Sequence, residues 1–242
     1  MVDFEFQGKS VTLPCIVQKA SSLTSFFLVP SAAARRLLPD DALSVIEFLP
    51  GRTLLSLGCI DYEENDLGDY EEVMFALFVR ESAKGKAPGF ARAWLDFARS
   101  RLGTYVHRLP VNQTFTCEAG RALWGFPKTV EEIRFDVRDG RVSWSLAMDG
   151  REVLSLLGKT GGKSKVPEMN ARTYSYIDGR LHVTPFVSSA SEVGFELGGA
   201  APELGEHPVA DELRSLGLPK RPLMTVWAGR MRARFEAARP VG

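Results

Sequence analysis

Lys128 closes the stretch WGFPK (124–128), and its surroundings point more clearly to chemistry than those of any other side chain. Gly125 permits an unusual backbone path, while Pro127 fixes its own φ and restricts Phe126 before it. The rings of Trp124 and Phe126 can exclude water, and loss of water favours a neutral amine over an ammonium. A neutral amine attacks a ketone or an aldehyde to form a Schiff base, so the stretch predicts a carbonyl-trapping lysine. The alternative is a surface lysine at the end of a loop.

Two charged residues lie shortly before this lysine and are candidates to contact a substrate. Glu118 and Arg121 belong to the stretch CEAGRALWGFPK (117–128), together with the rings of Trp124 and Phe126. Side chains this close in sequence to Lys128 can face the same cavity. For Glu118 the alternative is an outward-facing position in a strand.

Strand patterns dominate the chain that must position these residues. Runs at 53–62, 71–80 and 104–111 are apolar and rich in residues that favour strands. The triplet Asp-Gly-Arg occurs at 139–141, 149–151 and 178–180, each time between two such runs. Asp-Gly supplies the positive φ values of a two-residue hairpin turn, so the middle third is expected to be an antiparallel meander. The stretch 112–120 is also expected to be a strand, leading into a turn at Gly-Arg.

Helical patterns are fewer. Ser31 is a plausible N-cap for a short helix that Pro39 ends, and an apolar stripe over 88–103 predicts a second helix ended by Gly103. A third is expected around 208–216. Apolar residues at helical spacing predict a fourth over 222–238, opened by Pro222. Its run of arginines is expected to form a solvated or intersubunit face. The sequence therefore predicts an α+β fold, mainly antiparallel β with peripheral helices, in one domain over residues 1–242.

Composition excludes several classes of partner. Lys+Arg and Asp+Glu number 30 each, so the formal net charge is zero and no overall field attracts nucleic acid or an anionic membrane. A near-zero charge permits self-association, and we expect a homo-oligomer. The sequence shows neither a signal-peptide pattern nor an apolar run of membrane-spanning length, which indicates a cytoplasmic protein.

Metal and nucleotide sites are not expected. The three cysteines and three histidines are scattered, without the spacing of metal ligands, and the cysteines are expected to be reduced. The stretch GKTGGKS (158–164) is similar to a phosphate-binding loop, but Gly158 and Gly162 are separated by three residues instead of four. The region 157–170 is therefore expected to be a flexible basic loop.

Two segments resemble the acetoacetate decarboxylase family. Gly120-Arg121 followed by Gly125-Phe126-Pro127-Lys128 resembles the family's active-site segment, and LGDYEEVMF (67–75) resembles its Gly-x-Tyr-x-Glu strand. The resemblance implies a barrel-like, mainly antiparallel fold with an interior site. It also implies that Lys128 is the Schiff-base lysine and that Glu72 is the acidic residue near it. Taken by itself, Glu72 is more typical of a surface carboxylate at a strand end.

The sequence also departs from the family pattern. Thr129 stands where the decarboxylase has a second lysine, so desolvation alone is expected to favour the neutral amine of Lys128. A second family carboxylate falls near Leu57, where no acid exists, and the family's N-terminal arginine has no clear counterpart. These departures point to a larger or more apolar carbonyl substrate, or to imine chemistry other than decarboxylation.

The resemblance implies a Schiff-base-forming lyase that acts on an oxo acid or a ketone, by default a β-keto acid decarboxylase. Two alternatives remain open: an aldolase or dehydratase that uses the same lysine imine, and a non-catalytic barrel that binds an apolar ligand. No cofactor or metal is implied, because a lysine imine supplies the electron sink itself.

Overall fold

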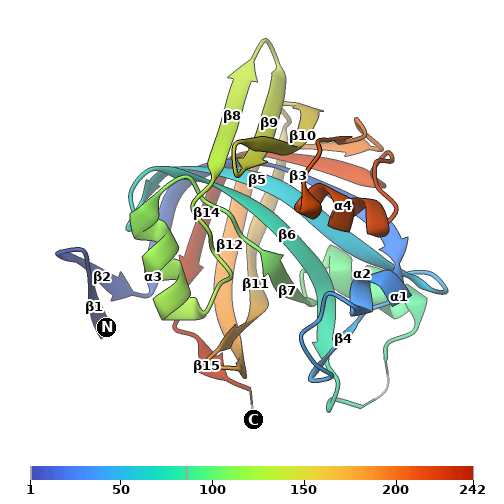
Figure 1. Cartoon of the computed structure of the whole chain (residues 1–242), viewed down its shortest axis with the longest axis horizontal. Helices are drawn as coiled ribbons and strands as arrows, with labels where there is room; N and C mark the ends of the chain where they lie inside the picture. The colour runs from blue at the N-terminus through green and yellow to red at the C-terminus, as the bar shows by residue number, and fades with distance from the viewer. Residues whose placement is uncertain (1, 86, 242) are drawn as a thin grey trace.

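Seven long strands pair edge to edge into a closed barrel in the computed structural model, which describes residues 2–85 and 87–241 (Figure 1). Every pair is antiparallel except β7 with β11, and β11 pairs back onto β12 to close the ring. The mainly antiparallel, barrel-like fold is therefore confirmed. In spatial order the strands are β11 (Ser164–Ile177), β7 (Gly103–Arg108), β6 (Tyr70–Glu81), β5 (Arg52–Asn65), β3 (Cys15–Pro30), β14 (Met224–Phe235) and β12 (Arg180–Leu197).

Shorter strands extend this barrel. A four-stranded sheet contains β8 (Glu132–Arg138), β9 (Arg141–Met148), β10 (Arg151–Lys159) and β13 (Glu203–Leu204). The hairpin of β8 and β9 projects at the top of Figure 1, and the hairpin of β1 (Val2–Phe6) and β2 (Lys9–Leu13) projects at the left. The strand β4 (Leu43–Val45) pairs with β6, and β15 (Arg239–Pro240) pairs with β12.

The three predicted Asp-Gly turns are present. Asp139, Asp149 and Asp178 have φ values of 49°, 51° and 49°, and the glycine after each also has a positive φ. They connect β8 to β9, β9 to β10 and β11 to β12, each as an antiparallel pair. Asp-Gly thus sets these registers by local turn chemistry.

Three of the expected helices form. They are α1 (Ser31–Arg35), α2 (Phe90–Ala98) and α4 (Pro208–Ser215). Ser31 is the first residue of α1 and Pro30 occupies the N-cap, so the expected cap was one residue too late. The helix α2 ends at Ala98, before Gly103, which instead begins β7.

The helix predicted over 222–238 is wrong, because these residues form β14. Exposed arginines alternate with buried or half-buried residues in the run RMRARF (230–235), which is the period of two that a strand requires. The apolar residues before this run also fit a helical spacing, and that coincidence misleads. Pairing with both β3 and β12 decides the outcome, since β14 completes the barrel.

The strand predicted over 112–120 is also wrong, because α3 (Thr114–Trp124) forms there. Phe115, Ala119 and Leu123 are buried and recur every four positions, so they share one helix face. The flexible loop expected over 157–170 is a third error. The strand β10 continues to Lys159 and β11 starts at Ser164, which leaves only a short connection between two barrel-associated strands.

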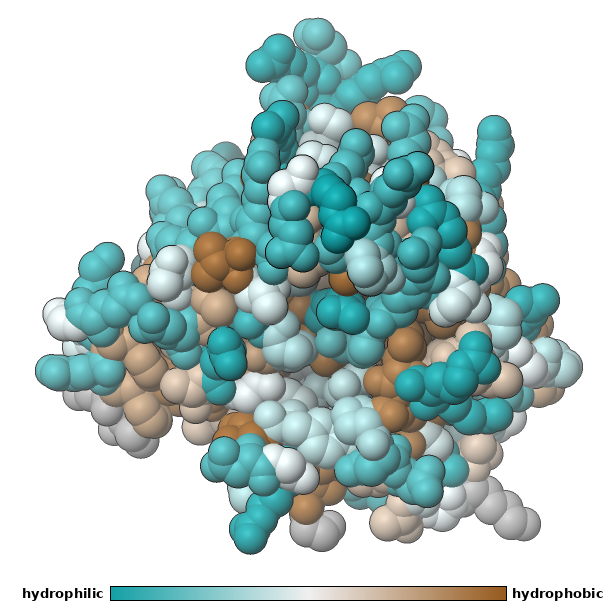
Figure 2. Space-filling view, viewed as in Figure 1, coloured by the Kyte–Doolittle hydropathy of each residue, from teal (hydrophilic) through white to brown (hydrophobic). Residues whose placement is uncertain are grey.

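The face that carries α3 and α4 is covered mostly by hydrophilic side chains (Figure 2). In the part of the chain that the structure describes, no helix is long and apolar enough to cross a membrane. Beneath α3 lies a separate cluster of buried side chains from the barrel and the β1–β2 hairpin, and this cluster surrounds Lys128.

Candidate active site

One end of the barrel gathers polar side chains from four strands. Cys15 and Val17 begin β3, Tyr62 lies near the end of β5, Tyr70 and Glu72 begin β6, and Phe235 ends β14. Because neighbouring antiparallel strands run in opposite directions, the start of one strand lies beside the end of the next. These residues therefore line one cavity, together with the segment that follows α3.

The end of α3 directs Lys128 into this cavity. Gly125 closes the helix in the left-handed conformation, with φ 63°, and its N–H donates to the Arg121 carbonyl at 3.0 Å. A Cβ at Gly125 would lie 2.6 Å from the Tyr176 carbonyl oxygen, so the close approach to β11 requires glycine. The following residues run beside 109–111, where the Val111 N–H donates to the Thr129 carbonyl at 2.9 Å. Lys128 is held between these two anchors.

Gly120 makes room for the lysine side chain. A Cβ built on this helical glycine would lie 2.6 Å from Cδ, 2.7 Å from Cε and 3.2 Å from Nζ of Lys128. The stem of Lys128 therefore crosses the surface of α3 at the one position where the helix has no side chain. The glycine of the Gly-Arg pair thus has a steric role in the path of the lysine.

Lys128 and Glu72 form a buried ion pair. The distance from Nζ to Oε2 is 2.7 Å, and the side chains are only 2% and 8% exposed. The other carboxylate oxygen, Oε1, accepts a hydrogen bond of 3.2 Å from the Tyr62 hydroxyl. Nζ also lies 5.0 Å from the centre of the Tyr70 ring, which is a cation–π contact.

This pairing corrects one expectation. Desolvation does not act alone on the amine, because an opposite charge in contact favours the charged form. Breaking such a pair leaves one buried charge without a partner, at a cost of about 3–5 kcal/mol. The pair therefore places a nucleophilic nitrogen in direct contact with a carboxylate, away from water.

The other titratable groups of the cavity stay protonated at neutral pH. Burial raises the pKa of Tyr62 and of Tyr70 well above the ordinary value of 10.0, and the Glu72 carboxylate raises both further. Burial and the Asp66 carboxylate raise the pKa of the Cys15 thiol to about 12, against the opposing effect of Lys128. These groups therefore bring no second negative charge to the amine.

The cavity around the amine is small and has aromatic walls. Its volume is about 40 Å³, and Trp124, Phe126 and Phe235 close one side. The indole Nε1 of Trp124 donates to the Glu236 carbonyl at 2.8 Å, which fixes the ring. Ligand pockets usually measure about 300–1,000 Å³, so this space suits a small substituent rather than a whole substrate.

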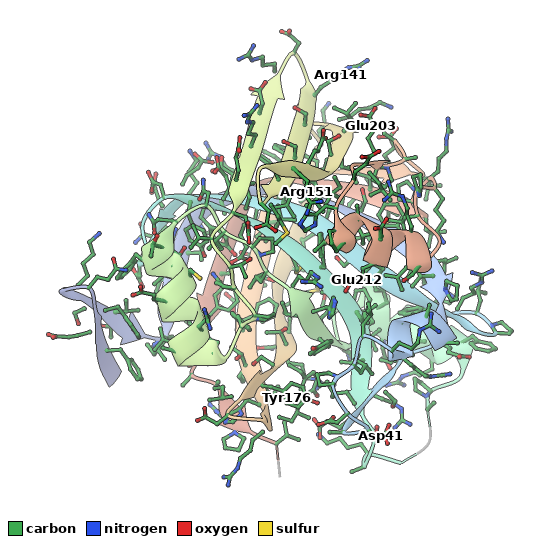
Figure 3. All side chains as sticks on the ribbon, in the orientation of Figure 1. Asp41, Arg141, Arg151, Tyr176, Glu203 and Glu212 are labelled. Atoms are coloured by element: carbon green, nitrogen blue, oxygen red, sulfur yellow. The ribbon has the colours of Figure 1, made fainter. Side chains whose placement is uncertain are left out.

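A second cavity of about 270 Å³ also contacts Lys128. Its polar lining comes from His107, Arg108, Arg121 and Thr129. Glu212, labelled in Figure 3 on α4, accepts hydrogen bonds from Arg108 Nε at 3.0 Å and from Arg108 Nη2 at 2.9 Å, and its Oε1 lies 2.9 Å from His107 Nε2. Within the described residues no ion pair involves Arg121, which is exposed. This cavity therefore places the guanidinium groups of Arg108 and Arg121 on one side of Lys128.

The structure brings most of the expected site residues together. Lys128, Glu72, Trp124 and Phe126 line the small cavity, and Arg121 lines the larger one. Glu118 is exposed on α3 and lines neither cavity, because it shares the exposed face of the helix with Arg121 and Ala122.

Two site residues escaped the sequence reasoning. Tyr62 and Tyr70 are directly paired across the β5–β6 hairpin, and their rings stack at 4.5 Å. Tyr62 lies directly opposite Tyr70, and Glu72 follows Tyr70 by two residues. Because side chains alternate between the two faces of a strand, all three lie on the same face of the sheet. That signal could have found Tyr62 once the hairpin register was known. Leu57, where a second carboxylate was sought, is buried in the main core instead.

The sequence model of the acetoacetate decarboxylase family matches residues 6–233. The chain belongs to this family. Among curated proteins, none matches the sequence. The resemblance seen in the two motifs is therefore confirmed over nearly the whole chain.

Solved structures show the same fold. The acetoacetate decarboxylase of Legionella pneumophila subsp. pneumophila str. Philadelphia 1 superimposes with a TM-score of 0.64 at 15% identity, over 95% of this chain and 87% of that one. The enduracididine biosynthesis enzyme MppR, complexed with pyruvate, gives 0.64 at 16% identity, over 96% and 92%. An acetoacetate decarboxylase-like enzyme from Sphingomonas wittichii RW1 gives 0.60 at 15%, over 99% and 98%. At these identities the likeness concerns the fold alone.

The described residues do not meet the requirements of a metal site. In residues 2–85 and 87–241 no group of three or more His, Cys, Asp or Glu side chains could hold an ion.

Proposed function

We propose that this protein is a Schiff-base-forming lyase that acts on an oxo acid or a ketone through Lys128, by default as a β-keto acid decarboxylase. The observation that carries the proposal is the buried contact of 2.7 Å between Nζ of Lys128 and Oε2 of Glu72. It joins a nucleophile to a proton acceptor in a water-poor cavity. Membership of the acetoacetate decarboxylase family supports the same chemistry.

The reaction begins with proton exchange in the pair. The Lys128 ammonium passes one proton to Glu72, and the free amine attacks the carbonyl carbon of the substrate. The hydroxyl of the resulting carbinolamine takes the proton back from Glu72 and leaves as water. The products of this stage are a protonated imine and the original Glu72 carboxylate, so charge and protons balance.

The protonated imine then acts as the electron sink. In a β-keto acid the bond between the α-carbon and the carboxylate breaks, carbon dioxide leaves, and the electron pair moves through the α-carbon to the imine nitrogen as an enamine. One solvent proton adds to the α-carbon, and water hydrolyses the imine to release the ketone and Lys128.

Each cavity is proposed to hold a different part of the substrate. The small cavity, bounded by Trp124 and Phe126, accepts the smaller substituent of the carbonyl carbon. The larger cavity presents Arg121, whose guanidinium suits a carboxylate. Glu118 is not part of this proposal, because it lies on the exposed face of α3. Replacing Arg121 with alanine is expected to raise KM for an oxo acid more than for a neutral ketone.

Aldol cleavage, condensation or dehydration through the same imine is a second candidate. Thr129 replaces a second lysine, so the site presents a hydroxyl where the decarboxylase has a cation. MppR, which shares this fold, was solved with pyruvate and with the condensation product of pyruvate and imidazole 4-carboxaldehyde. Family membership therefore does not fix the bond that is broken or formed.

A panel of carbonyl compounds tests the proposal. The protein is incubated with 3-oxo acids, pyruvate and larger ketones, and carbon dioxide release and product masses are measured. Turnover is expected to vanish in Lys128→Ala and to persist in Lys159→Ala, a matched control on an exposed lysine whose Nζ pairs with Glu196 at 2.8 Å. Binding of apolar ligands without turnover or imine formation would instead support a non-catalytic barrel.

A further inference from the structure

We infer that Tyr62 is a positioning residue that acts through Glu72 to set the pH range in which the Lys128 amine becomes reactive. The inference rests on the proposed function, since it assigns a role within the same site. It concerns a residue outside both family-like motifs.

The contact between Tyr62 and Glu72 is the first support. Glu72 uses Oε2 for Lys128 at 2.7 Å and Oε1 for the Tyr62 hydroxyl at 3.2 Å. Each carboxylate oxygen thus has one partner, and the plane of the carboxylate is fixed by two points. A free carboxylate could rotate and present either oxygen, so Tyr62 holds Oε2 toward the amine.

The stacking of Tyr62 on Tyr70 is the second support. The rings are 4.5 Å apart at an angle of 18°. The Tyr70 ring also lies 5.0 Å from Nζ of Lys128, so the four side chains form a closed ring of contacts.

The electrostatic surroundings of Glu72 identify Tyr62 as the neutral donor. Burial keeps Tyr62 protonated, because it raises the pKa of that phenol well above 10.0. A neutral hydroxyl that donates to a carboxylate stabilises the anion and thereby the ammonium paired with it. The titratable groups that line the cavity with Glu72 in the described residues are Cys15 from β3, Tyr62 from β5, Tyr70 from β6, and Lys128 after α3.

Removing only the hydroxyl tests this role. Tyr62→Phe keeps the ring and its stacking, but Oε1 of Glu72 loses its donor. The carboxylate then takes up a proton more readily, and the amine becomes free at lower pH. A hydrogen bond to a charged group is worth about one to two pH units, and we expect the midpoint of Lys128 reactivity to fall by about one.

Labelling with acetic anhydride measures this midpoint without any turnover. The protein is pulsed at a series of pH values, and mass spectrometry quantifies acetylation of the Lys128 peptide relative to that of Lys159. Tyr70→Phe is the matched control, because its hydroxyl does not contact Glu72. It is expected to shift the midpoint by less than half as much as Tyr62→Phe.

A double variant tests whether Tyr62 acts through Glu72. In the Glu72→Gln background, the further change Tyr62→Phe is expected to leave the midpoint unmoved. Equal shifts in both backgrounds would overturn the inference, and so would an unmoved midpoint in Tyr62→Phe alone. Should Tyr62→Phe fail to fold, Tyr62→Leu, which has no hydrogen-bond donor in its side chain, replaces it under the same criteria.

Turnover separates the two proposals. With an active substrate, Tyr62→Phe is expected to lower kcat by about 10- to 100-fold, because a Glu72 carboxyl that holds its proton more tightly returns it less readily to the carbinolamine. KM is expected to stay within about threefold of the parent. Absence of turnover in the parent protein would sink the proposed function, while the acetylation midpoints would still decide the role of Tyr62.

Discussion

Two glutamates of this molecule each hold a cation, and they differ in what the cation can do. Glu212 on α4 accepts two hydrogen bonds from Arg108 of β7 and also contacts His107, whereas Glu72 contacts Lys128 once and accepts one hydrogen bond from Tyr62. Arginine stays protonated in proteins, so the Glu212 cluster can only fix α4 to the barrel. Lysine can release its proton, and the Glu72 pair can therefore start a reaction.

Burial sharpens the difference between these pairs. The side chains of Arg108 and Glu212 are 36% and 20% exposed, against 2% and 8% for Lys128 and Glu72. Water screens the first pair, so it contributes little beyond its geometry. The second pair sits in a low-dielectric setting, where proton position changes the energy of the whole cavity. Reactivity in this fold thus depends on the type of cation and on the exclusion of water.

The largest effect is expected from Glu72→Gln, with Glu212→Gln as its matched control. Loss of the proton acceptor is expected to lower turnover by about 10²–10⁴-fold, while imine trapping persists because it needs only the amine and the carbonyl. Glu212→Gln is expected to leave turnover within about threefold of the parent, because Glu212 lies outside the pathway of the proton. Steady-state kinetics on both variants makes the comparison, and equal losses in the two would break it.

Glu72→Gln also removes one partner of a buried pair, so folding must be checked. A cost of about 3–5 kcal/mol is expected if the ammonium stays charged, and a smaller one if the amine becomes neutral. Thermal unfolding of the variant measures this cost. Complete loss of folding would make Glu72 a structural residue.

Gly120→Ala is expected to have the next largest effect. The new Cβ would lie 2.6 Å from Cδ and 2.7 Å from Cε of Lys128, so the stem must move and the amine must leave its position against Glu72. We expect about a 100-fold loss in kcat, in the range that misplacement of a catalytic group produces. Ala122→Gly is a control on the exposed side of the same helix. A parent-like kcat in Gly120→Ala would show that the helix surface does not position the lysine.

Thr129→Lys tests the departure from the family pattern. Two like charges in contact in a low-dielectric site would shift the pH midpoint of imine formation by about one to two units. Thr129 is exposed, however, while Lys128 is buried, so solvent screens the new ammonium and we expect a downward shift below about one unit. The midpoint is read from imine formation with a simple diketone. A shift of two units or more would show that the new ammonium is shielded from solvent beside Lys128.

The smallest effect is expected on stability at low pH, through Glu212. Burial raises the pKa of this carboxyl, but hydrogen bonds from His107 and Arg108 outweigh it and lower the pKa from 4.5 to about 2. Because the pKa of Glu212 is lower in the folded protein than in the unfolded chain, its carboxylate stabilises the fold at pH values above 4.5. This stabilisation is lost as the pH falls from 4.5 to about 2. Unfolding midpoints of the parent are expected to decline more steeply over this window than those of Glu212→Gln. Parallel curves would contradict the assignment.

Local chemistry made the path of the WGFPK segment and the turns predictable. The stiffness of WGFPK and the Asp-Gly turns depend on a few adjacent residues, and the structure places both as expected. The exposed position of Glu118 was missed because 112–120 was taken for a strand, and a helix presents a different face. Tyr62 was missed because its contact with Glu72 depends on the register of β5 against β6, which no single segment specifies. The long strand β14 was misjudged because barrel closure, a non-local constraint, decides its conformation.

The most direct test of the central claim is reductive trapping followed by mass spectrometry. The protein is incubated with acetoacetate, pyruvate or a larger ketone, reduced with borohydride, and digested to map the adduct. We predict a single adduct on Lys128 that is lost in Lys128→Ala and Lys128→Arg and retained in Glu72→Gln. An adduct that persists in Lys128→Ala, for example on Lys159 or Lys163, would contradict the claim that Lys128 is the carbonyl-trapping amine.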